Sequence, residues 1–458
     1  MKKIDLVFRT VGERTTDIAL EFAKKNIKPE KVHLIENVKP FSKAMQMILK
    51  LDIEADFIVF MDADCIILEN MRPFLDKNAA AYVDCFVLDK FRGKIHTGVH
   101  ITRRDVFEEM KRVKIQKNDM KYLLRPESRR RNLALEALKE GKQFKRFRIF
   151  HDFFQNYRDI YVKYALRELR SRTEHARLKL NFAMENWHND DFDYVVAREA
   201  VKYARSIIKD YSSPQKIENF IKLLPEIALK KLKILHLDEK KKLKMQEVLN
   251  LRGAFNAIGQ FDSKEKIFCI GLGRTGTKSL TAALDIFGYN IIHYPHDLTT
   301  FEELSSGDYN LSILQDYDGI SDITISPYYP QLDKEFPNSK FILTVRDKES
   351  WLKSFEKHWS DRPPFDDPNQ NEIYMKMRRL LRASVYGTYK FNRDRMGYIF
   401  DLHTKNTLDY FKDKPEKLLV LNIFEQDSFK KLCSFLNVPE INNNFPDVKT
   451  NEHLFELL

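Results

Sequence analysis

The chain has 458 residues, of which 43% are hydrophobic and 12% aromatic, so it can fill two or three folded domains and is not expected to be disordered. No apolar run reaches the roughly 18 residues that a membrane span needs, and the early acid at Asp5 argues against a signal peptide. A formal net charge of +11 favours anionic partners, but no zinc-finger or RNA-recognition signature points to nucleic acid.

The four cysteines lie far apart and form no Cys-x-x-Cys pair. This usage predicts reduced thiols in a cytoplasmic protein. Small nucleotide donors would account for much of the excess positive charge, and a solvated basic face is the alternative. Nothing in the composition predicts an oligomeric state.

Strand and helix patterns alternate over the first 110 residues. Apolar strand patterns cover 4–8 and 32–35, and helical spacing covers 16–25 and 41–51. A longer apolar strand begins at 56 and ends in Asp62-Ala63-Asp64. Two later strands are expected at 80–83 and 97–101, which predicts a doubly wound α/β domain.

Two carboxylates at the carboxyl end of a buried strand can hold a hard divalent ion against a diphosphate. The apolar strand ending in Asp62 and Asp64 resembles that of the GT-A glycosyltransferases, which carry this Asp-x-Asp motif. The resemblance implies a nucleotide-sugar donor with Mn²⁺ or Mg²⁺ on Asp62 and Asp64, and donor contacts from Arg9 and Arg14 after the first strand. The alternatives are acids that simply end a strand, and surface arginines.

Residues 105 to 260 are expected to be mostly helical and heavily charged. Within them, the stretch 150–159 loosely resembles the acidic motif that carries the base of inverting GT-A enzymes. Asp152 is the candidate base, with His151 as a second base or a metal ligand. A helix N-terminus capped near Asp152 is the competing interpretation. The stretch 251–263 reads as the link to a C-terminal domain.

A phosphate loop is predicted after the apolar strand 267–270. Gly271, Gly273 and Gly276 let the backbone close around an anion, and a helical pattern begins directly afterwards, so free N–H groups and the helix dipole would face it. A Walker A loop is a poor match, because Thr277 stands where its lysine belongs and Lys278 comes one residue late. A dinucleotide fingerprint lacks its acidic residue at the end of the next strand.

The stretch Gly273-Arg274-Thr275-Gly276-Thr277 resembles the 5′-phosphosulfate loop of PAPS-dependent sulfotransferases. A second strand, 340–345, ends in Arg346, and Ser354 follows eight residues later, which is the spacing of the 3′-phosphate pair in that family. The resemblance covers about residues 264 to 458. It implies PAPS as co-substrate, held by Gly273, Arg274, Thr275, Gly276, Thr277, Lys278, Ser279, Arg346 and Ser354.

Sulfuryl transfer places charge on the oxygens around the moving sulfur, so fixed cations and N–H donors should carry most of the catalysis. Arg274 is the candidate for the bridging oxygen. Since related families use either an imidazole or a carboxylate as base, His293 and Asp322 are ranked together. Packing at a strand end is the alternative for His293.

The sequence therefore predicts two doubly wound α/β domains, at 1–165 (GT-A-like) and 263–458 (sulfotransferase-like, P-loop-like), joined by a helical extension at 166–262. The predicted function is a bifunctional transferase that glycosylates and sulfates a glycan or glycolipid acceptor. One alternative is a sulfotransferase with a non-catalytic glycan-binding module. Another makes the C-terminal half a P-loop kinase.

Overall fold

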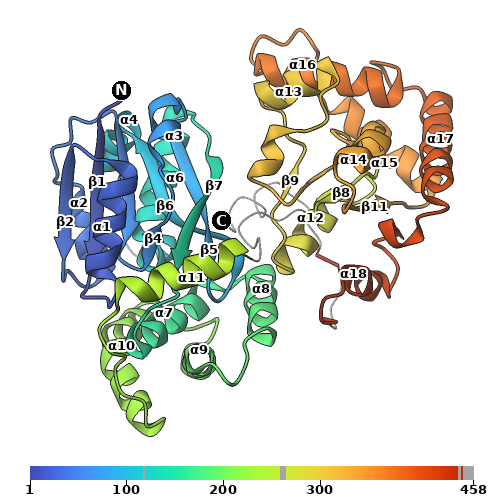
Figure 1. The fold of residues 1–458 in the computed structure, drawn as a ribbon. Coiled ribbons are helices and arrows are strands. Elements are labelled where there is room, and N and C mark those ends of the chain that lie inside the picture. Colours follow the sequence, from blue (N-terminus) through green and yellow to red (C-terminus); the bar gives the residue numbers. More distant parts are fainter. Residues whose placement is uncertain (117–118, 258–264, 442–444, 447–458) are drawn as a thin grey trace. The chain divides into compact units, whose positions relative to one another are not determined.

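The computed structural model describes residues 1–116, 119–257, 265–441 and 445–446, apart from the side chains of residues 94 and 95. The chain divides into two compact units, Met1–Phe261 and Asp262–Leu458, each with its own α/β architecture (Figure 1). The predicted boundary between 262 and 263 lies outside the described residues. The division into 1–165 and 166–262 stays a prediction, and the helices beyond 166 fall in the same compact unit as the first sheet.

The N-terminal unit contains a mixed seven-stranded sheet with the order β2-β1-β3-β6-β5-β7-β4. Its strands are β1 (Ile4–Thr10), β2 (Lys31–Glu36), β3 (Phe57–Asp62), β4 (Cys65–Ile67), β5 (Tyr82–Asp89), β6 (Gly93–Arg103) and β7 (Gln143–His151). The first three run parallel, whereas β6 runs antiparallel to both β3 and β5. The strand β7 lies within the stretch expected to be mostly helical.

Short helices cover this sheet, namely α1 (Thr16–Ile27), α2 (Phe41–Ile48), α3 (Arg72–Lys77), α4 (Arg104–Arg112) and α6 (Pro126–Leu138). The short helix α5 (Met120–Leu124) packs instead against a separate hydrophobic cluster. Alternating burial along β3 explains why both faces need cover: Phe57, Val59 and Met61 belong to one hydrophobic cluster, and Ile58 and Phe60 to another. The α/β class expected for this half is confirmed.

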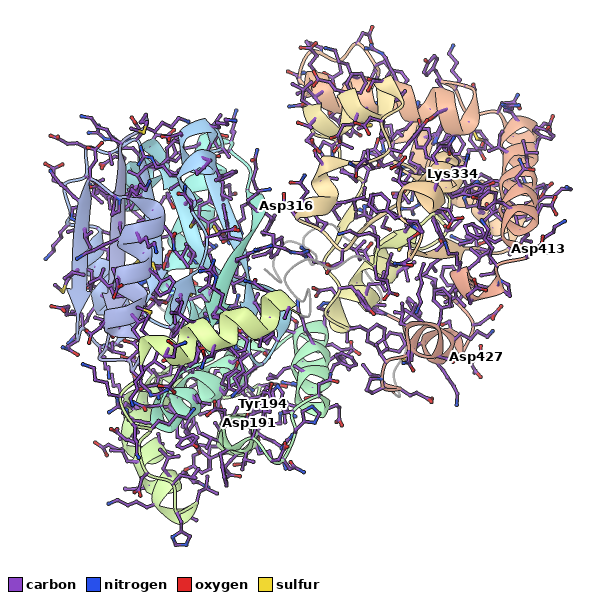
Figure 2. All side chains as sticks on the ribbon, in the orientation of Figure 1. Asp191, Tyr194, Asp316, Lys334, Asp413 and Asp427 are labelled. Carbon is purple, nitrogen blue, oxygen red and sulfur yellow. The ribbon has the colours of Figure 1, made fainter. Side chains whose placement is uncertain are left out.

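A helical group follows, made of α7 (Tyr157–Arg170), α8 (Glu174–Glu185), α9 (Phe192–Ile207) and α10 (Pro214–Ile234), with its own aromatic core (Figure 1). Asp191 and Tyr194, labelled in Figure 2, fix the start of α9: Asp191 caps it, and the Tyr194 hydroxyl donates to the Lys90 carbonyl at 3.1 Å. The helix α11 (Met245–Ala257) covers the predicted link from 251 up to 257, and its Val248 is buried against the sheet core.

The C-terminal unit contains a parallel five-stranded sheet with the order β12-β11-β8-β10-β9. Its strands are β8 (Ile267–Cys269), β9 (Ile291–His293), β10 (Gly319–Ser321), β11 (Lys340–Thr344) and β12 (Leu418–Leu421). Its helices are α12 (Thr277–Ile286), α13 (Leu298–Ser306), α14 (Tyr329–Glu335), α15 (Lys348–Ser360), α16 (Glu372–Leu381), α17 (Arg393–Phe411) and α18 (Ser428–Leu436). Because β8 is the central strand, the loop after it emerges between the ends of β10 and β11, where ligands of parallel sheets bind.

None of the described helices is both long and apolar enough to cross a membrane.

Candidate functional site

The loop between β8 and α12 closes tightly because two of its glycines have no room for a side chain. A Cβ on Gly271 would lie 1.9 Å from the Thr344 hydroxyl oxygen, and one on Gly276 would lie 2.3 Å from Ile423 Cδ1. Gly276 also has φ +105° and directly precedes the first residue of α12. The free N–H groups of the first turn of α12 therefore lie beside the loop, as an anion site requires.

Two arginines and a serine from three segments meet beside this loop. The Arg274 guanidinium donates from Nε to Ser354 Oγ at 3.2 Å, and Arg346 Nη1 donates to the Arg274 carbonyl at 3.1 Å. Burial and the Arg274 charge lower the pKa of Arg346. Neither arginine pairs with a carboxylate in the described part of the chain. Two cationic residues are therefore in contact, with no anionic side chain among the described residues to balance their charge. That arrangement suits a phosphate or sulfate.

The other residues predicted to hold the donor lie in the loop and in the first turn of α12. Thr275 is 1% exposed, and its hydroxyl donates to the Leu272 carbonyl at 2.6 Å, so this side chain holds the loop together rather than facing a ligand. Thr277 Oγ1 lies 3.3 Å from His293 Nε2. Lys278 and Ser279 are half-buried on the first turn of α12.

The two candidate bases of the C-terminal unit form one pair. His293 ends β9, Asp322 directly follows the neighbouring strand β10, and His293 Nε2 lies 3.1 Å from Asp322 Oδ2. Burial opposes ionisation of Asp322, but His293 and the Ile323 N–H, which donates to Oδ1 at 2.7 Å, lower its pKa below the usual value. The carboxylate is therefore ionised and can orient the imidazole.

In the N-terminal unit, Asp62 is already paired with an arginine. Arg9 Nε lies 2.5 Å from Asp62 Oδ1, its Nη1 donates to Glu127, and the guanidinium lies 4.7 Å from the centre of the Phe41 ring. Arg9 is 7% exposed. This arginine, predicted as a nucleotide contact, is therefore paired with Asp62 and Glu127 of its own unit.

Asp64 lies in a buried cluster centred on Lys163 of α7. The Lys163 ammonium donates to Asp64, to Asp152 Oδ1 at 2.6 Å, and approaches His151 Nε2 at 2.9 Å. Burial disfavours the charge on Asp64, but Lys163 and His151 lower its pKa well below the usual range. Lys163 was not among the predicted site residues. The sequence gives no signal for it, because its position against Asp64 and Asp152 depends on the packing of α7.

A divalent ion shared by Asp62 and Asp64 does not fit these residues as they lie. Possible ligand atoms do gather nearby, in the sets Asp64, Cys65 and His151, and Asp89, His96 and His151. However, an ammonium already lies against Asp64 and His151, His151 Nδ1 lies 2.5 Å from Asp89, and Asp62 belongs to neither set. Positive charge from Arg9 and Lys163 takes the place that an ion would need.

The remaining N-terminal candidates are held inside the unit. Asp152 is 1% exposed with φ +65°, and α7 begins only at Tyr157 behind Asn156, so Asp152 is not the residue that caps it. Burial raises the pKa of Asp152. Arg14 donates to the Lys241 and Phe154 carbonyls, which tie the loop after β1 to later segments.

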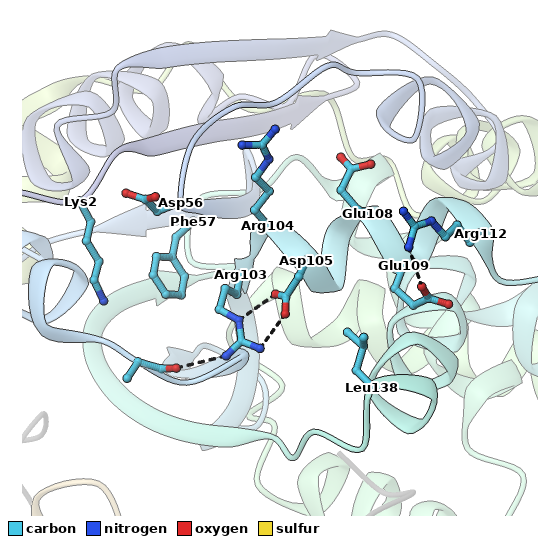
Figure 3. A pocket seen from close by; sticks show the side chains of 11 residues that line it. Lys2, Asp56, Phe57, Arg103, Arg104, Asp105, Glu108, Glu109, Arg112 and Leu138 are labelled. Carbon is cyan, nitrogen blue, oxygen red and sulfur yellow. Dashed lines mark hydrogen bonds and ion pairs between the residues drawn. The ribbon is translucent and has the colours of Figure 1, made fainter.

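A hollow of about 800 Å³ opens at the other end of the N-terminal sheet, beside Phe57 at the start of β3 (Figure 3). Two ion pairs join residues of its lining, Arg103 with Asp105 at 2.7 Å and Arg112 with Glu109 at 3.4 Å. It lies away from Asp62, which ends the same strand, and has no part in the candidate site.

Comparison with known proteins gives the class. Residues 266–454 match a family model described as a sulfotransferase domain, which confirms the resemblance expected from the loop and from Arg346. The chain is a transferase with a sulfotransferase domain in its C-terminal unit.

Among curated proteins, the chain is similar to the Ava biosynthesis cluster protein M of Aspergillus versicolor. The two are 24% identical over 221 residues, which are 41% of this chain and 82% of that protein. This relative spans less than half of the chain, so the other residues have no counterpart in that alignment.

Solved structures similar to the chain include a glycosyltransferase involved in the glycosylation of the major capsid of PBCV-1. It is 9% identical, has a TM-score of 0.23, and the match covers 32% of this chain and 92% of that one. Another is the apo-form glycosyltransferase GlyE of Streptococcus pneumoniae TIGR4, 10% identical with a TM-score of 0.20 over 85% of this chain and 100% of that one. Scores this low support no statement about activity.

Proposed function

We propose that the C-terminal unit transfers a sulfuryl group from PAPS to a hydroxyl of an acceptor. The observation that supports this most is the meeting of Arg274, Arg346 and Ser354 beside the glycine loop, with the His293–Asp322 pair next to the same helix start. Arg274, Arg346 and Ser354 offer hydrogen-bond donors for the phosphosulfate and the 3′-phosphate of PAPS. The His293–Asp322 pair offers a proton acceptor.

In the proposed step, the acceptor oxygen bonds to sulfur while the bond between sulfur and the bridging oxygen of the phosphosulfate breaks. The acceptor proton passes to the His293–Asp322 pair. Adenosine 3′,5′-bisphosphate leaves with negative charge on the former bridging oxygen, and the Arg274 guanidinium stabilises that charge electrostatically. Arginine keeps its proton at neutral pH, so Arg274 does not act as a general acid.

A thermal-shift experiment on the full chain tests the donor class. Adenosine 3′,5′-bisphosphate should raise the melting temperature, because a ligand that binds only the folded state stabilises it. ATP with Mg²⁺ should not. Stabilisation by ATP with Mg²⁺ alone would favour the kinase alternative.

For the N-terminal unit we propose glycosyl transfer from a nucleotide sugar to a glycan or glycolipid, which would make the enzyme bifunctional. The supporting observation is the cluster of carboxylates and cations around Asp62 and Asp64, where β3 ends. Dependence on Mn²⁺ or Mg²⁺ stays a prediction, and it would require Arg9 and Lys163 to leave their carboxylates. A unit that binds glycans without transferring sugar would bind acceptor but fail to hydrolyse any nucleotide sugar.

A further inference from the structure

Helix α7 presents three cations on one face, close to Asp64. Lys163, Arg167 and Arg170 follow one another at intervals of four and three residues, so they share one side of the helix. Lys163 is neutralised by Asp64 and Asp152. Within the described residues, neither Arg167 nor Arg170 lies within ion-pair distance of a carboxylate.

The contacts of these two arginines are all with neutral groups. Arg170 donates from Nε to the Leu124 carbonyl at 2.9 Å, and Arg167 Nη2 lies 3.3 Å from His96 Nε2. Arg167 is 7% exposed, and its Nε has no hydrogen-bond partner. A buried guanidinium N–H without an acceptor costs free energy, and an oxygen atom of a bound ligand would supply that acceptor.

A third guanidinium completes the group from another element. Arg125 connects α5 to α6, directly after Leu124, whose carbonyl Arg170 contacts. Burial together with Arg167 and Arg92 lowers the pKa of Arg125 to about 10, and burial together with Arg125 and Arg167 lowers that of Arg170 to about 9. These guanidinium groups repel one another, and an anion between them would relieve that repulsion.

The acids that face this group are already engaged. Asp89 interacts electrostatically with Arg167, but it accepts a hydrogen bond from His151. Asp62 interacts electrostatically with Arg170, but it is paired with Arg9. The Asp62 side chain is 40% exposed, so solvent reaches the side of the arginine group that lies next to Asp62. The cations therefore lie beside the carboxyl end of β3, where a nucleotide would bind in an α/β sheet.

We propose that Arg125, Arg167 and Arg170 form an anion site for the diphosphate of a nucleotide, and that these guanidinium groups replace a divalent ion in the N-terminal unit. Guanidinium groups bind phosphate oxygens in a two-pronged manner and keep their charge without a metal. The identity of the ligand as a nucleotide rests on the glycosyl transfer proposed above. The anion site itself can be tested with inorganic pyrophosphate.

The test is calorimetric titration of UDP and of pyrophosphate into the full-length Arg274→Ala, Arg346→Ala double variant, which removes the phosphate cations of the other unit. Each ligand is titrated with EDTA and again with Mn²⁺. We expect the Kd for UDP in EDTA to lie within about threefold of that in Mn²⁺, and adding Arg167→Ala or Arg170→Ala to raise it at least about tenfold.

Arg172→Ala is the matched control, because Arg172 lies two residues beyond the end of α7 and is paired with Asp210. It should change the Kd less than about twofold. If Arg167→Ala does not fold, Arg167→Lys serves in its place. Lysine keeps the positive charge but lacks the two parallel N–H donors of the guanidinium, so binding should weaken at least about threefold.

Binding of UDP only with Mn²⁺, unchanged affinity in the arginine variants, or no binding of either diphosphate would overturn the site. Pyrophosphate binding without transfer from any nucleotide sugar would keep the anion site and remove the glycosyl transfer.

Discussion

Arg346 is the residue whose role is easiest to separate from that of its neighbours. If it holds the 3′-phosphate, Arg346→Ala should raise the Kd for adenosine 3′,5′-bisphosphate about tenfold to a hundredfold, since a charge-assisted contact to phosphate is lost. The Kd for adenosine 5′-phosphate, which has no 3′-phosphate, should stay within about twofold. Titration of both nucleotides measures this.

Lys357→Ala is the control for Arg346, since Lys357 is an exposed cation on α15. Equal weakening of both nucleotides by Arg346→Ala would contradict the assignment to the 3′-phosphate.

Asp322 is expected to act in turnover rather than in donor binding. Asp322→Asn should lower kcat about 10²–10⁴-fold, because the amide cannot stabilise a protonated His293. Asparagine tolerates the φ of +86° at this position, so the backbone should persist. Release of adenosine 3′,5′-bisphosphate from PAPS in the presence of hydroxyl acceptors measures the rate, and wild-type turnover would remove Asp322 from the mechanism.

Asp333 stabilises the C-terminal unit through three donors. Lys414 donates to it at 2.6 Å, Tyr410 at 3.1 Å, and Lys417 also contacts it. Although burial opposes ionisation, these donors lower its pKa below the ordinary 3.8, so its stabilisation is present above that value and is lost as the pH falls through the folded-state pKa.

Asp333→Asn should therefore lower the free energy of unfolding by about 1–3 kcal/mol at pH 7. The difference from the wild type should shrink below about pH 4. Urea denaturation at both pH values measures it, and a difference that grows on acidification would be the contrary result.

At the scale of elements, the β8–α12 turn depends on the absence of a side chain at Gly271. Gly271→Ala should destabilise the C-terminal unit by about 1–3 kcal/mol and abolish binding of adenosine 3′,5′-bisphosphate, because the added methyl overlaps Thr344. Gly141→Ala is the control, since nothing lies within 4 Å of the position its Cβ would take. Calorimetric melting with and without the nucleotide checks both, and normal binding by Gly271→Ala would contradict the loop geometry.

Much of the element order was predictable from apolar patterns, since β1, β3 and β11 are apolar, largely buried runs that end in polar residues, and β8 is a buried apolar run shortly before the glycine loop. The strand β7 was missed because basic residues interrupt the apolar pattern along Gln143–His151, and β10 because Gly319-Ile320-Ser321 contains a single large apolar residue. The meeting of His293 with Asp322 depends on the pairing of β9 with β10 and so could not be predicted from either segment alone.

Lys163 shows the limit for site residues. It is one of 78 lysines and arginines, and nothing local separates it from the others. Its importance comes from the long-range placement of α7 against Asp64 and Asp152, 99 and 11 residues away in the chain. Asp62 and Asp64 were predicted as a pair, but the structure gives each its own cation.

At the scale of the whole molecule, two compact units carry two separate groups of uncompensated cations. One group lies beside the glycine loop and the His293–Asp322 pair. The other lies on and beside α7, near Asp62 and Asp64. Two donors with different anions would explain why one chain needs both. The sulfotransferase match covers only the C-terminal group.

The central claim is that the loop around Arg274 holds the phosphosulfate donor, and titration of adenosine 3′,5′-bisphosphate into the wild type, Arg274→Ala and Arg167→Ala tests it most directly. Binding by the wild type and by Arg167→Ala, with at least about tenfold weaker binding by Arg274→Ala, is the predicted result. No binding by the wild type, or equal affinity in Arg274→Ala, would contradict it.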